Sequence, residues 1–389
     1  MKQTLTFNAS VVKSTASRIN VDAWDPCLDA YDNKDYKKSL HLLLDYINPE
    51  IRRKYGNMSE TEYTIPHGTV DVTVKFGEEE LVITAPFLRL PEKNKIPMMR
   101  QAAVLNFNNL YLTQIELKEN DLYFDYTCPT KLVYPYKLYY IFREICAIGD
   151  KYNAEFTAKF GAQRITEAKI KPYDAQTIDT IYKVIQDSCK ECHEGVKYFE
   201  NERKYGFAWN IIDCTLLKVL YYADPKGQLR YDINKVVYDM DREEVPLIEA
   251  NAMGKKMVEQ IQAMPKDELA KYLYHTECFV SAKNRSTLKN VQDNFKSSYE
   301  KITNYYEQAD YMSACVMISY QFYNMYFYND VQDDINEVVV SAFEASSGQT
   351  WEKAAPILYK AMRSIMTGDL APVKSESKGF FSSLFGKKK

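Results

Sequence analysis

Apolar and polar residues alternate in a regular way between Glu62 and Phe160. From Val70 to Phe76 every second residue is apolar, which is the period of a strand with one buried face. Residues 81–85 follow a turn at residues 77–78 and can form a second strand that pairs with the first. The two segments are therefore a predicted hairpin. The order of patterns in this stretch is strand, strand, helix, strand, strand, helix.

A second predicted hairpin and two predicted helices complete this stretch. Apolar residues alternate over 113–117 and again over 122–126, on either side of a polar turn at 119–121. Helical spacing follows Pro97, and a longer stripe of apolar residues at intervals of three and four runs from Leu138 to Tyr152. Such stripes can cover one face of an antiparallel sheet. We therefore predict an α+β fold in which helices cover an antiparallel sheet.

The 389-residue chain is long for a single core, and its composition divides it into five predicted parts. These are an N-terminal helical hairpin (1–60), an α+β module (61–170), an all-α domain (171–367), a polar linker (368–378) and an amphipathic aromatic and lysine-bearing tail (379–389). In the all-α domain we expect about seven helices and no second sheet, apart from a short strand near Leu229 to Ile233.

A run without formally charged residues extends from Tyr311 to Tyr328, about the length of a short membrane span. It also contains serine, glutamine, asparagine and several tyrosines, and a bilayer centre would penalise that polarity. We predict a buried helix of the all-α domain.

Composition and charge limit the classes of function. The formal net charge of −3 and the lack of a basic, aromatic-interleaved stripe argue against nucleic-acid binding. Eight cysteines without a dense framework fit reduced thiols, and Met1 to Ser10 has no secretory pattern. We expect a cytoplasmic protein.

The chain also has 32 tyrosines, including Tyr134, Tyr136, Tyr139 and Tyr140. Tyrosine favours interfaces but can equally fill a core, and both interpretations remain open.

The segment Cys189-Lys190-Glu191-Cys192-His193 has the C-x-x-C-H form used for covalent haem attachment. Ile178, Ile185, Cys192 and Phe199 lie seven residues apart, so Cys192 falls on the buried stripe of a predicted helix. A closed zinc site would need a second ligand pair that the sequence lacks. We interpret the cysteines as core residues and predict no cofactor.

The spacing of Asp330, Asp333, Asp334 and Glu337 puts several carboxylates on one face of a predicted helix, where a hard cation could bind. Enzymes that use such aspartates need a second acidic motif on a facing helix, and none is convincing here. The favoured interpretation is structural: Asn329 caps the helix, and acids in its first turn complement the helix dipole.

Other catalytic signatures are missing from the sequence. It has no G-x-x-x-x-G-K-[ST] loop, G-x-G-x-x-G turn, H-E-x-x-H or G-x-S-x-G elbow. We therefore predict that the protein is not an enzyme, with an enzyme of unfamiliar site as the third hypothesis.

From Gly379 onwards the composition of the chain changes from polar to aromatic and lysine-rich. The candidate docking residues of this tail are Phe380, Phe381, Leu384, Phe385, Lys387, Lys388 and Lys389. So short a segment folds only on something else. A membrane surface would take the phenylalanines at the interface and the lysines at anionic headgroups, and a groove on a partner protein would take the same side chains. A tail without a binding role is the third interpretation.

Four phrases of the module carry a family resemblance: Val104-Leu105-Asn106, the hairpin at 113–126, Cys128-Pro129, and Ala147 to Tyr152. Through them the segment 63–161 resembles the YbjN family and, more distantly, the type III secretion chaperone-like fold. The resemblance implies a non-enzymatic α+β module that binds other polypeptides as a chaperone or regulator, often as a homodimer. The flanking helical parts depart from the family pattern, which bears on the dimer surface and on any role in secretion.

The hypothesis from the sequence is a cytoplasmic, protein-binding adaptor or chaperone-like protein. Protein partners would bind the module and the helical domain. The alternative is a regulator docked at the inner face of the membrane through its tail.

Overall fold

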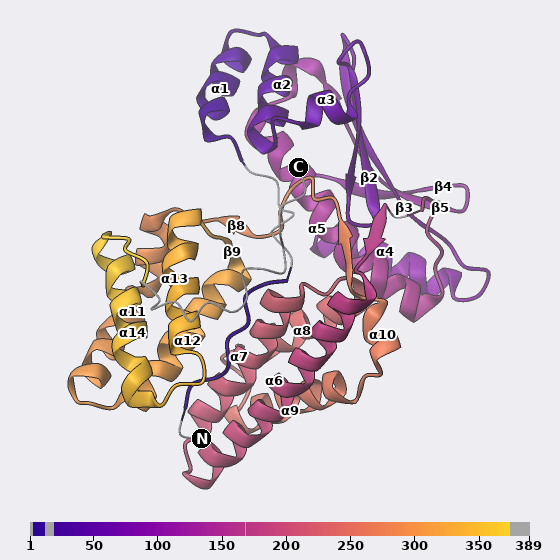
Figure 1. Cartoon of the computed structure of the whole chain (residues 1–389). Coiled ribbons are helices and arrows are strands. Elements are labelled where there is room, and N and C mark those ends of the chain that lie inside the picture. The colour runs from indigo at the N-terminus through magenta and orange to yellow at the C-terminus, as the bar shows by residue number, and fades with distance from the viewer. Residues whose placement is uncertain (1–2, 12–18, 168, 374–389) are drawn as a thin grey trace.

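The computed structural model describes residues 3–11, 19–167 and 169–373 (Figure 1). An antiparallel five-stranded sheet with covering helices is followed by a helical region, which confirms the predicted α+β class. The sheet and the N-terminal helices lie in the upper part of Figure 1, and the later helices form the lower part.

The sheet has the strand order β1-β2-β3-β5-β4, and every neighbouring pair is antiparallel. Its strands are β1 (Glu62–His67), β2 (Val70–Phe76), β3 (Glu80–Arg89), β4 (Gln114–Lys118) and β5 (Asp121–Pro129). Both predicted hairpins, β2–β3 and β4–β5, are confirmed.

Two helices cover one face of the sheet, as predicted: α4 (Lys95–Asn108) and α5 (Pro135–Phe160). The apolar stripe of α5 faces the buried side chains of β2 and β5. The approach is closest at Gly149, where an added Cβ would lie 3.1 Å from Cγ1 of Val70. A glycine at this position therefore lets the helix lie close on the sheet.

Strand β1 was not predicted from the sequence. It contains Pro66, and proline within a run argues against a central strand because it cannot donate to the ladder. In the structure β1 is an edge strand, with its ladder to β2 running from Glu62 opposite Lys75 to His67 opposite Val70. An edge position accommodates the proline.

The N-terminal helices share the core of the sheet. The 3₁₀ turn η1 (Val21–Ala23) leads into α1 (Trp24–Asp32), α2 (Tyr36–Ile47) and α3 (Ile51–Tyr55). Asp35 caps α2 by accepting a hydrogen bond from the amide of Lys38. Cys27, Leu40 and Leu43 are fully buried in the same apolar cluster as β2, β3 and α5.

Residues 171–367, all of which the structure describes, contain nine helices where we expected about seven. They are α6 (Ala175–Asn201), α7 (Tyr205–Ala223), α8 (Gly227–Met240), α9 (Leu247–Ala263), α10 (Lys266–Ala270), α11 (Leu288–Glu307), α12 (Tyr311–Tyr328), α13 (Asp333–Ser346) and α14 (Trp351–Thr367). The strand predicted near Leu229 to Ile233 is wrong, because Leu229 and Ile233 form part of the buried stripe of α8.

Two short ladders also occur in the later part of the chain, where no second sheet was expected. Strand β6 (Ile170–Pro172) pairs antiparallel with β7 (Tyr274–Thr276), and β8 (Asn284–Arg285) pairs in parallel with β9 (Asn329–Asp330). Strands of two or three residues are too short to show an alternating pattern in the sequence.

Helices α7 and α12 pack together at the centre of the helical region. Most residues of α7 are buried. Helix α12 spans the uncharged run from Tyr311 to Tyr328, which confirms the predicted buried helix. Within the part of the chain that the structure describes, no helix is long and apolar enough to cross a bilayer.

An extended N-terminal strap, residues 3–11, runs between two groups of these helices (Figure 1). The amide of Thr4 donates to the carbonyl of Gln349 between α13 and α14, and the amide of Thr6 donates to Oε1 of Glu191 on α6, each at 2.9 Å. The ring of Phe7 stacks on Phe343 with centroids 5.0 Å apart. The strap therefore joins α6 to α13 and α14.

Residues 274–286, here called the bridging segment, connect the helical region to the sheet. The amide of Gly68, in the turn between β1 and β2, donates to the carbonyl of Glu277 at 2.9 Å. The amide of Phe279 donates to Nδ1 of His67 at 3.0 Å. Phe279 and Val280 are buried in the apolar core of the sheet, although they lie far from it in sequence.

We expect Phe279→Ala to lower the free energy of unfolding by about 3–5 kcal/mol, since the ring is 1% exposed and packs 5.0 Å from Phe142. Urea denaturation measures the change. Phe107→Ala is the control, because Phe107 is 87% exposed and its truncation should leave the midpoint nearly unchanged. Equal effects of the two variants would contradict the assignment of Phe279 to the sheet core.

The buried acid Asp213 on α7 should make stability depend on pH. Burial, with the nearby Asp241, raises the pKa of Asp213 to about 8, and its Oδ1 has no hydrogen-bond partner among the described residues. Above about pH 4 the unfolded chain releases this proton while the folded chain keeps it. Stability is therefore lost as pH rises from about 4 towards 8, on the order of a few kcal/mol.

Thermal unfolding at pH 5 and pH 8 tests this linkage. Asp213→Asn cannot ionise, so its melting temperature should exceed that of the wild type by more at pH 8 than at pH 5. The exposed Asp267→Asn should show no such difference. The same offset for Asp213→Asn at both values of pH would contradict the linkage.

Candidate functional site

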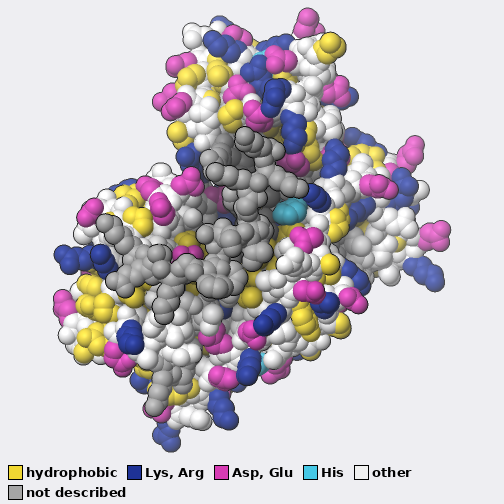
Figure 2. All heavy atoms as spheres, viewed as in Figure 1, with side chains coloured by type: hydrophobic (Ala, Val, Ile, Leu, Met, Phe, Trp, Pro, Cys, Tyr) yellow, Lys and Arg dark blue, Asp and Glu magenta, His cyan; other side chains and the backbone are white. Residues whose placement is uncertain are grey.

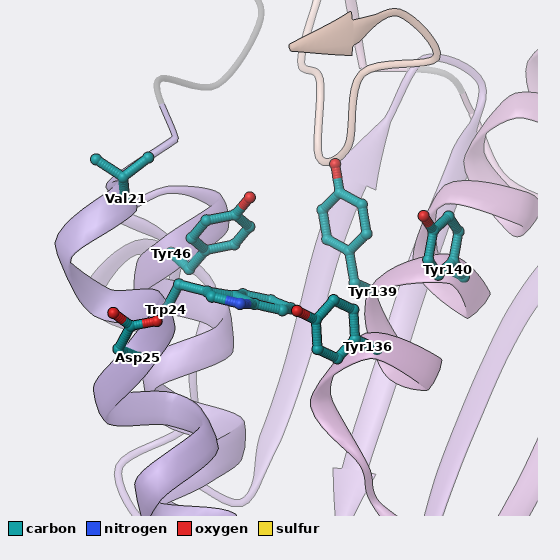
Figure 3. Close-up of a pocket in the computed structure, with 7 residues that line it drawn as sticks. All are labelled: Val21, Trp24, Asp25, Tyr46, Tyr136, Tyr139 and Tyr140. Atoms are coloured by element: carbon teal, nitrogen blue, oxygen red, sulfur yellow. The ribbon is translucent and has the colours of Figure 1, made fainter. Parts of the chain in front are cut away.

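An open cleft of about 390 Å³ lies between the N-terminal helices and the first turns of α5 (Figure 3). Its lining residues are mainly aromatic and come from η1, α1, α2 and α5: Val21, Trp24, Asp25, Tyr46, Tyr136, Tyr139 and Tyr140. We call it the aromatic cleft. Residues at least 90 positions apart in sequence form its two walls.

The start of α5 determines one wall. Pro135 begins the helix, where a missing amide hydrogen costs nothing. Tyr136, Tyr139 and Tyr140 follow at helical spacing and face the cleft, while Leu138 and Ile141 turn to the sheet. One face of the first two turns of α5 therefore packs in the core, and another face lines the cleft.

The other wall is made by Trp24 at the start of α1 and Tyr46 near the end of α2. The indole of Trp24 meets Tyr136 edge to face, with centroids 4.6 Å apart and an interplanar angle of 81° (Figure 3). Trp24 also lies 4.8 Å from Tyr46, which lies 6.0 Å from Tyr139. Aromatic pairs favour these distances, so the rings hold one another in place.

The tyrosine rings of the cleft are partly open to solvent. Burial raises the pKa of Tyr46 and of Tyr139, so both hydroxyl groups keep their protons. Tyr136 and Tyr140 are 45% and 52% exposed. Rigid aromatic surface with polar tips and access to solvent is typical of binding sites.

Charges of both signs border the aromatic cleft. Asp25 lines it on the α1 side. Towards the bridging segment, Arg143 on α5 donates through Nη2 to Oδ1 of Asn284 at 2.8 Å, and Arg285 donates through Nη1 to the carbonyl of Ile19 at 3.0 Å. Arg143 is thus held by the bridging segment, and Arg285 links that segment to the residue before η1.

The sequence pointed to the tyrosines of α5 but not to the opposite wall. The structure brings Tyr136, Tyr139 and Tyr140 into the aromatic cleft, and Tyr134 packs beside it, 5.7 Å from Tyr136. Trp24 was missed. It is one of three tryptophans in the chain, and a tryptophan at the start of a short acidic helix was the available signal.

The buried Cys146 and His67 and the partly exposed Asp150 form a group beside the turn between β1 and β2, which the sequence did not predict. Nε2 of His67 is 3.2 Å from Oδ2 of Asp150. Nδ1 accepts the amide hydrogen of Phe279, so in this arrangement the ring carries its proton on Nε2, facing Asp150. Cysteine, histidine and aspartate together can support nucleophilic catalysis. Here Cys146 is 0% exposed and burial raises the pKa of its thiol, so the group serves to fix the bridging segment.

The C-x-x-C-H segment lies within α6, as predicted. Cys189 and Cys192 are buried in the helical core, and burial raises their thiol pKa values to about 12 and about 11. His193 lies 2.9 Å through Nε2 from Oε1 of Gln262. Neither thiol is available on a loop surface.

Three of the four predicted acids, Asp333, Asp334 and Glu337, share one face at the start of α13, and Asp330 lies outside that helix. Asp330 lies in β9 opposite Arg285 of β8, while Asp333 and Asp334 begin α13 and Glu337 follows one turn later. The capping role predicted for Asn329 is wrong, because the N-cap of α13 is Gln332 and Asn329 begins the preceding strand.

The predicted placement of acids in the first turn of α13 is confirmed for Asp333 and Asp334. Among residues 3–11, 19–167 and 169–373, no three histidine, cysteine or acidic side chains are grouped so that they could hold a metal ion.

The predicted docking residues of the tail lie outside the described residues: Phe380, Phe381, Leu384, Phe385, Lys387, Lys388 and Lys389. Membrane or partner binding by the tail stays a prediction.

Comparison of the chain with protein-family models, with curated proteins and with solved structures gives no match.

Tyr136→Ala and Tyr140→Ala should each change the free energy of unfolding by less than about 1 kcal/mol, because about half of each side chain is already exposed. Chemical denaturation measures this. Tyr63→Ala, at a residue that is 0% exposed in the sheet core, is the comparison and should cost about 3 kcal/mol or more. A large loss at Tyr136 or Tyr140 would show that the cleft tyrosines are core residues.

Proposed function

We propose that this protein is a non-enzymatic, polypeptide-binding adaptor or chaperone-like protein whose docking site is the aromatic cleft. The observation that carries the proposal is a solvent-open cleft of about 390 Å³ with walls of tryptophan and tyrosine. Such rings offer large contact area at low conformational cost, which is why they dominate binding hot spots.

The position of the cleft supports this proposal. Its walls come from α1, α2 and α5, whose rings pack on one another and on the core below. A preformed site loses little side-chain entropy when a partner binds. The partly exposed Tyr136 and Tyr140 would lose solvent contact on binding, which gives the apolar driving force.

A second apolar surface supports the binding of another polypeptide or of a second copy. On α4, the side chains that face away from the sheet include Ile96, Met99, Val104 and Phe107, and all are exposed. Tyr111, just beyond the helix, is 83% exposed. Exposed apolar residues that recur along one helix face mark interaction surfaces more often than scattered ones do.

The proposed function also agrees with the resemblance to the YbjN and secretion chaperone-like modules. That resemblance is itself a proposal. Two hairpins, each followed by a helix on the same face of one sheet, make up β2 to α5. The N-terminal helices α1 and α2, which pack on α5, are a departure from that module. They build the cleft that we propose as the docking site.

Selection from a phage-displayed library of random peptides tests the proposal. The wild type should enrich a set of related peptides, and Tyr136→Ala/Tyr140→Ala should bind them at least roughly tenfold more weakly, because two anchoring rings are lost. Fluorescence anisotropy measures the affinities.

The matched control is Tyr205→Ala, since Tyr205 is 43% exposed and lies at the start of α7, outside the cleft. It should bind as the wild type does. Peptides that bind the double variant and the wild type equally would place the site elsewhere, and failure to enrich any peptide would contradict the proposed function.

A further inference from the structure

We propose that the aromatic cleft recognises a lysine- or arginine-containing segment of a partner polypeptide, with the cation held between aromatic rings and a row of aspartates on α1. This inference rests on the proposed function and names the chemistry of its ligand. Of the four aspartates, Asp25 lines the cleft together with Trp24 and Tyr136.

The outer face of η1 and α1 carries four aspartates: Asp22, Asp25, Asp29 and Asp32. Spacings of three, four and three residues place them on one face, and all four are exposed. Residues 19–33 contain no lysine or arginine. Figure 2 shows acidic side chains on the outer edge of the lobe that contains α1.

Only Asp25 lies in the first turn of α1, where an acid complements the helix dipole; Asp29 and Asp32 do not stabilise the helix in this way. Like charges three and four residues apart repel one another, and Asp29 and Asp32 lie towards the negative end of the helix dipole. None of the four forms an ion pair with another residue of the described chain. The repulsion would be relieved by a cation supplied from outside.

The aspartate row meets the aromatic cleft at residues 24 and 25. Trp24 and Asp25 are adjacent in sequence and both line the cleft. The edge-to-face contact of Trp24 with Tyr136 leaves the Tyr136 ring 45% exposed. An ammonium or guanidinium group can therefore contact an aromatic face and a carboxylate together, and tryptophan and tyrosine bind cations best among aromatic residues.

The basic groups near the cleft do not occupy this position. Arg143 donates to Ala282 and Asn284, and Arg285 donates to Ile19, so both guanidinium groups have partners within the chain and neither pairs with an aspartate of α1. They favour placing a ligand cation on the α1 side. The aspartate row repels nucleic acid and anionic membranes, which leaves a basic polypeptide as the fitting partner.

The test compares three fluorescein-labelled peptides that differ only in alternate positions, occupied by lysine, glutamine or glutamate, with alanine between them. Anisotropy with the full-length protein should give the tightest binding for the lysine peptide and none for the glutamate peptide. Asp25→Asn/Asp29→Asn should weaken the lysine peptide roughly tenfold, and raising NaCl from about 50 to about 300 mM should weaken it in the wild type.

Two control variants separate charge from folding. Asp267→Asn removes an exposed first-turn aspartate from the distant helix α10 and should leave the affinity unchanged. Asp25→Asn/Asp29→Asn should melt close to the temperature of the wild type, because relief of the repulsion between the two aspartates offsets the loss of the favourable first-turn charge of Asp25. A clearly lower melting temperature would assign these aspartates to the fold and overturn the inference.

The remaining outcomes distinguish this inference from the proposed function. If selected peptides bind through Tyr136 and Tyr140 but the lysine and glutamine peptides bind equally, the cleft binds polypeptides without recognising a cation. The inference then fails and the proposed function stands. If no peptide of either experiment binds in a manner that depends on Tyr136 and Tyr140, both fail.

Discussion

The docking of the bridging segment on the turn between β1 and β2 is the contact on which the relative position of the two cores depends. Gly68 makes this contact possible. Its φ is +54°, and an added Cβ would lie 1.8 Å from Oδ1 of Asp150, so a larger residue would strain the backbone and displace the Asp150 carboxylate. The bare backbone of this turn can then approach both Asp150 and Glu277, and the hydrogen bonds from Gly68 and Phe279 follow.

The same contact controls the aromatic cleft. Beyond Phe279 the bridging segment supplies the carbonyl of Ala282 and the side chain of Asn284 to Arg143, and it ends at Arg285, which binds the carbonyl of Ile19 just before η1. The segment thus touches α5 and the start of the N-terminal helices, the elements that form the two walls. A change in its docking would move the walls relative to each other.

The strap at residues 3–11 makes a corresponding connection within the helical region. Its backbone amides bind Glu191 on α6 and the residues between α13 and α14. Glu191 also lies 3.8 Å from the buried amine of Lys218 on α7, and burial lowers the pKa of that lysine. The carboxylate of Glu191 therefore accepts a hydrogen bond from the strap and also pairs with the buried amine of Lys218. These two interactions together fix the position of the Glu191 side chain.

The sheet hairpins and α12 could be predicted from the local periodicity of the sequence. Contacts between segments that are distant in the sequence could not. The alternation at Val70 to Phe76 and the uncharged run from Tyr311 are both set by one element packing on a core. Strand β1 was missed because Pro66 signals a break unless its edge position is known. The two- and three-residue ladders have no period to detect. The tyrosines of α5 were visible, but the cleft exists only because Trp24 is brought to them by tertiary packing.

The charges of the module show why α1 stands apart from its neighbours. Arg52 lies between Asp45 and Glu60, at 2.9 and 2.8 Å, and Lys118 pairs with Asp125. The aspartates of α1 lack such partners among the described residues. Helix α1 persists because its opposite face packs on α2 through Cys27 and Ala30, and tertiary packing outweighs the weak repulsion on its surface. The charge on its outer face thus remains available to groups outside the chain, beside a cleft that is already shaped to receive a side chain.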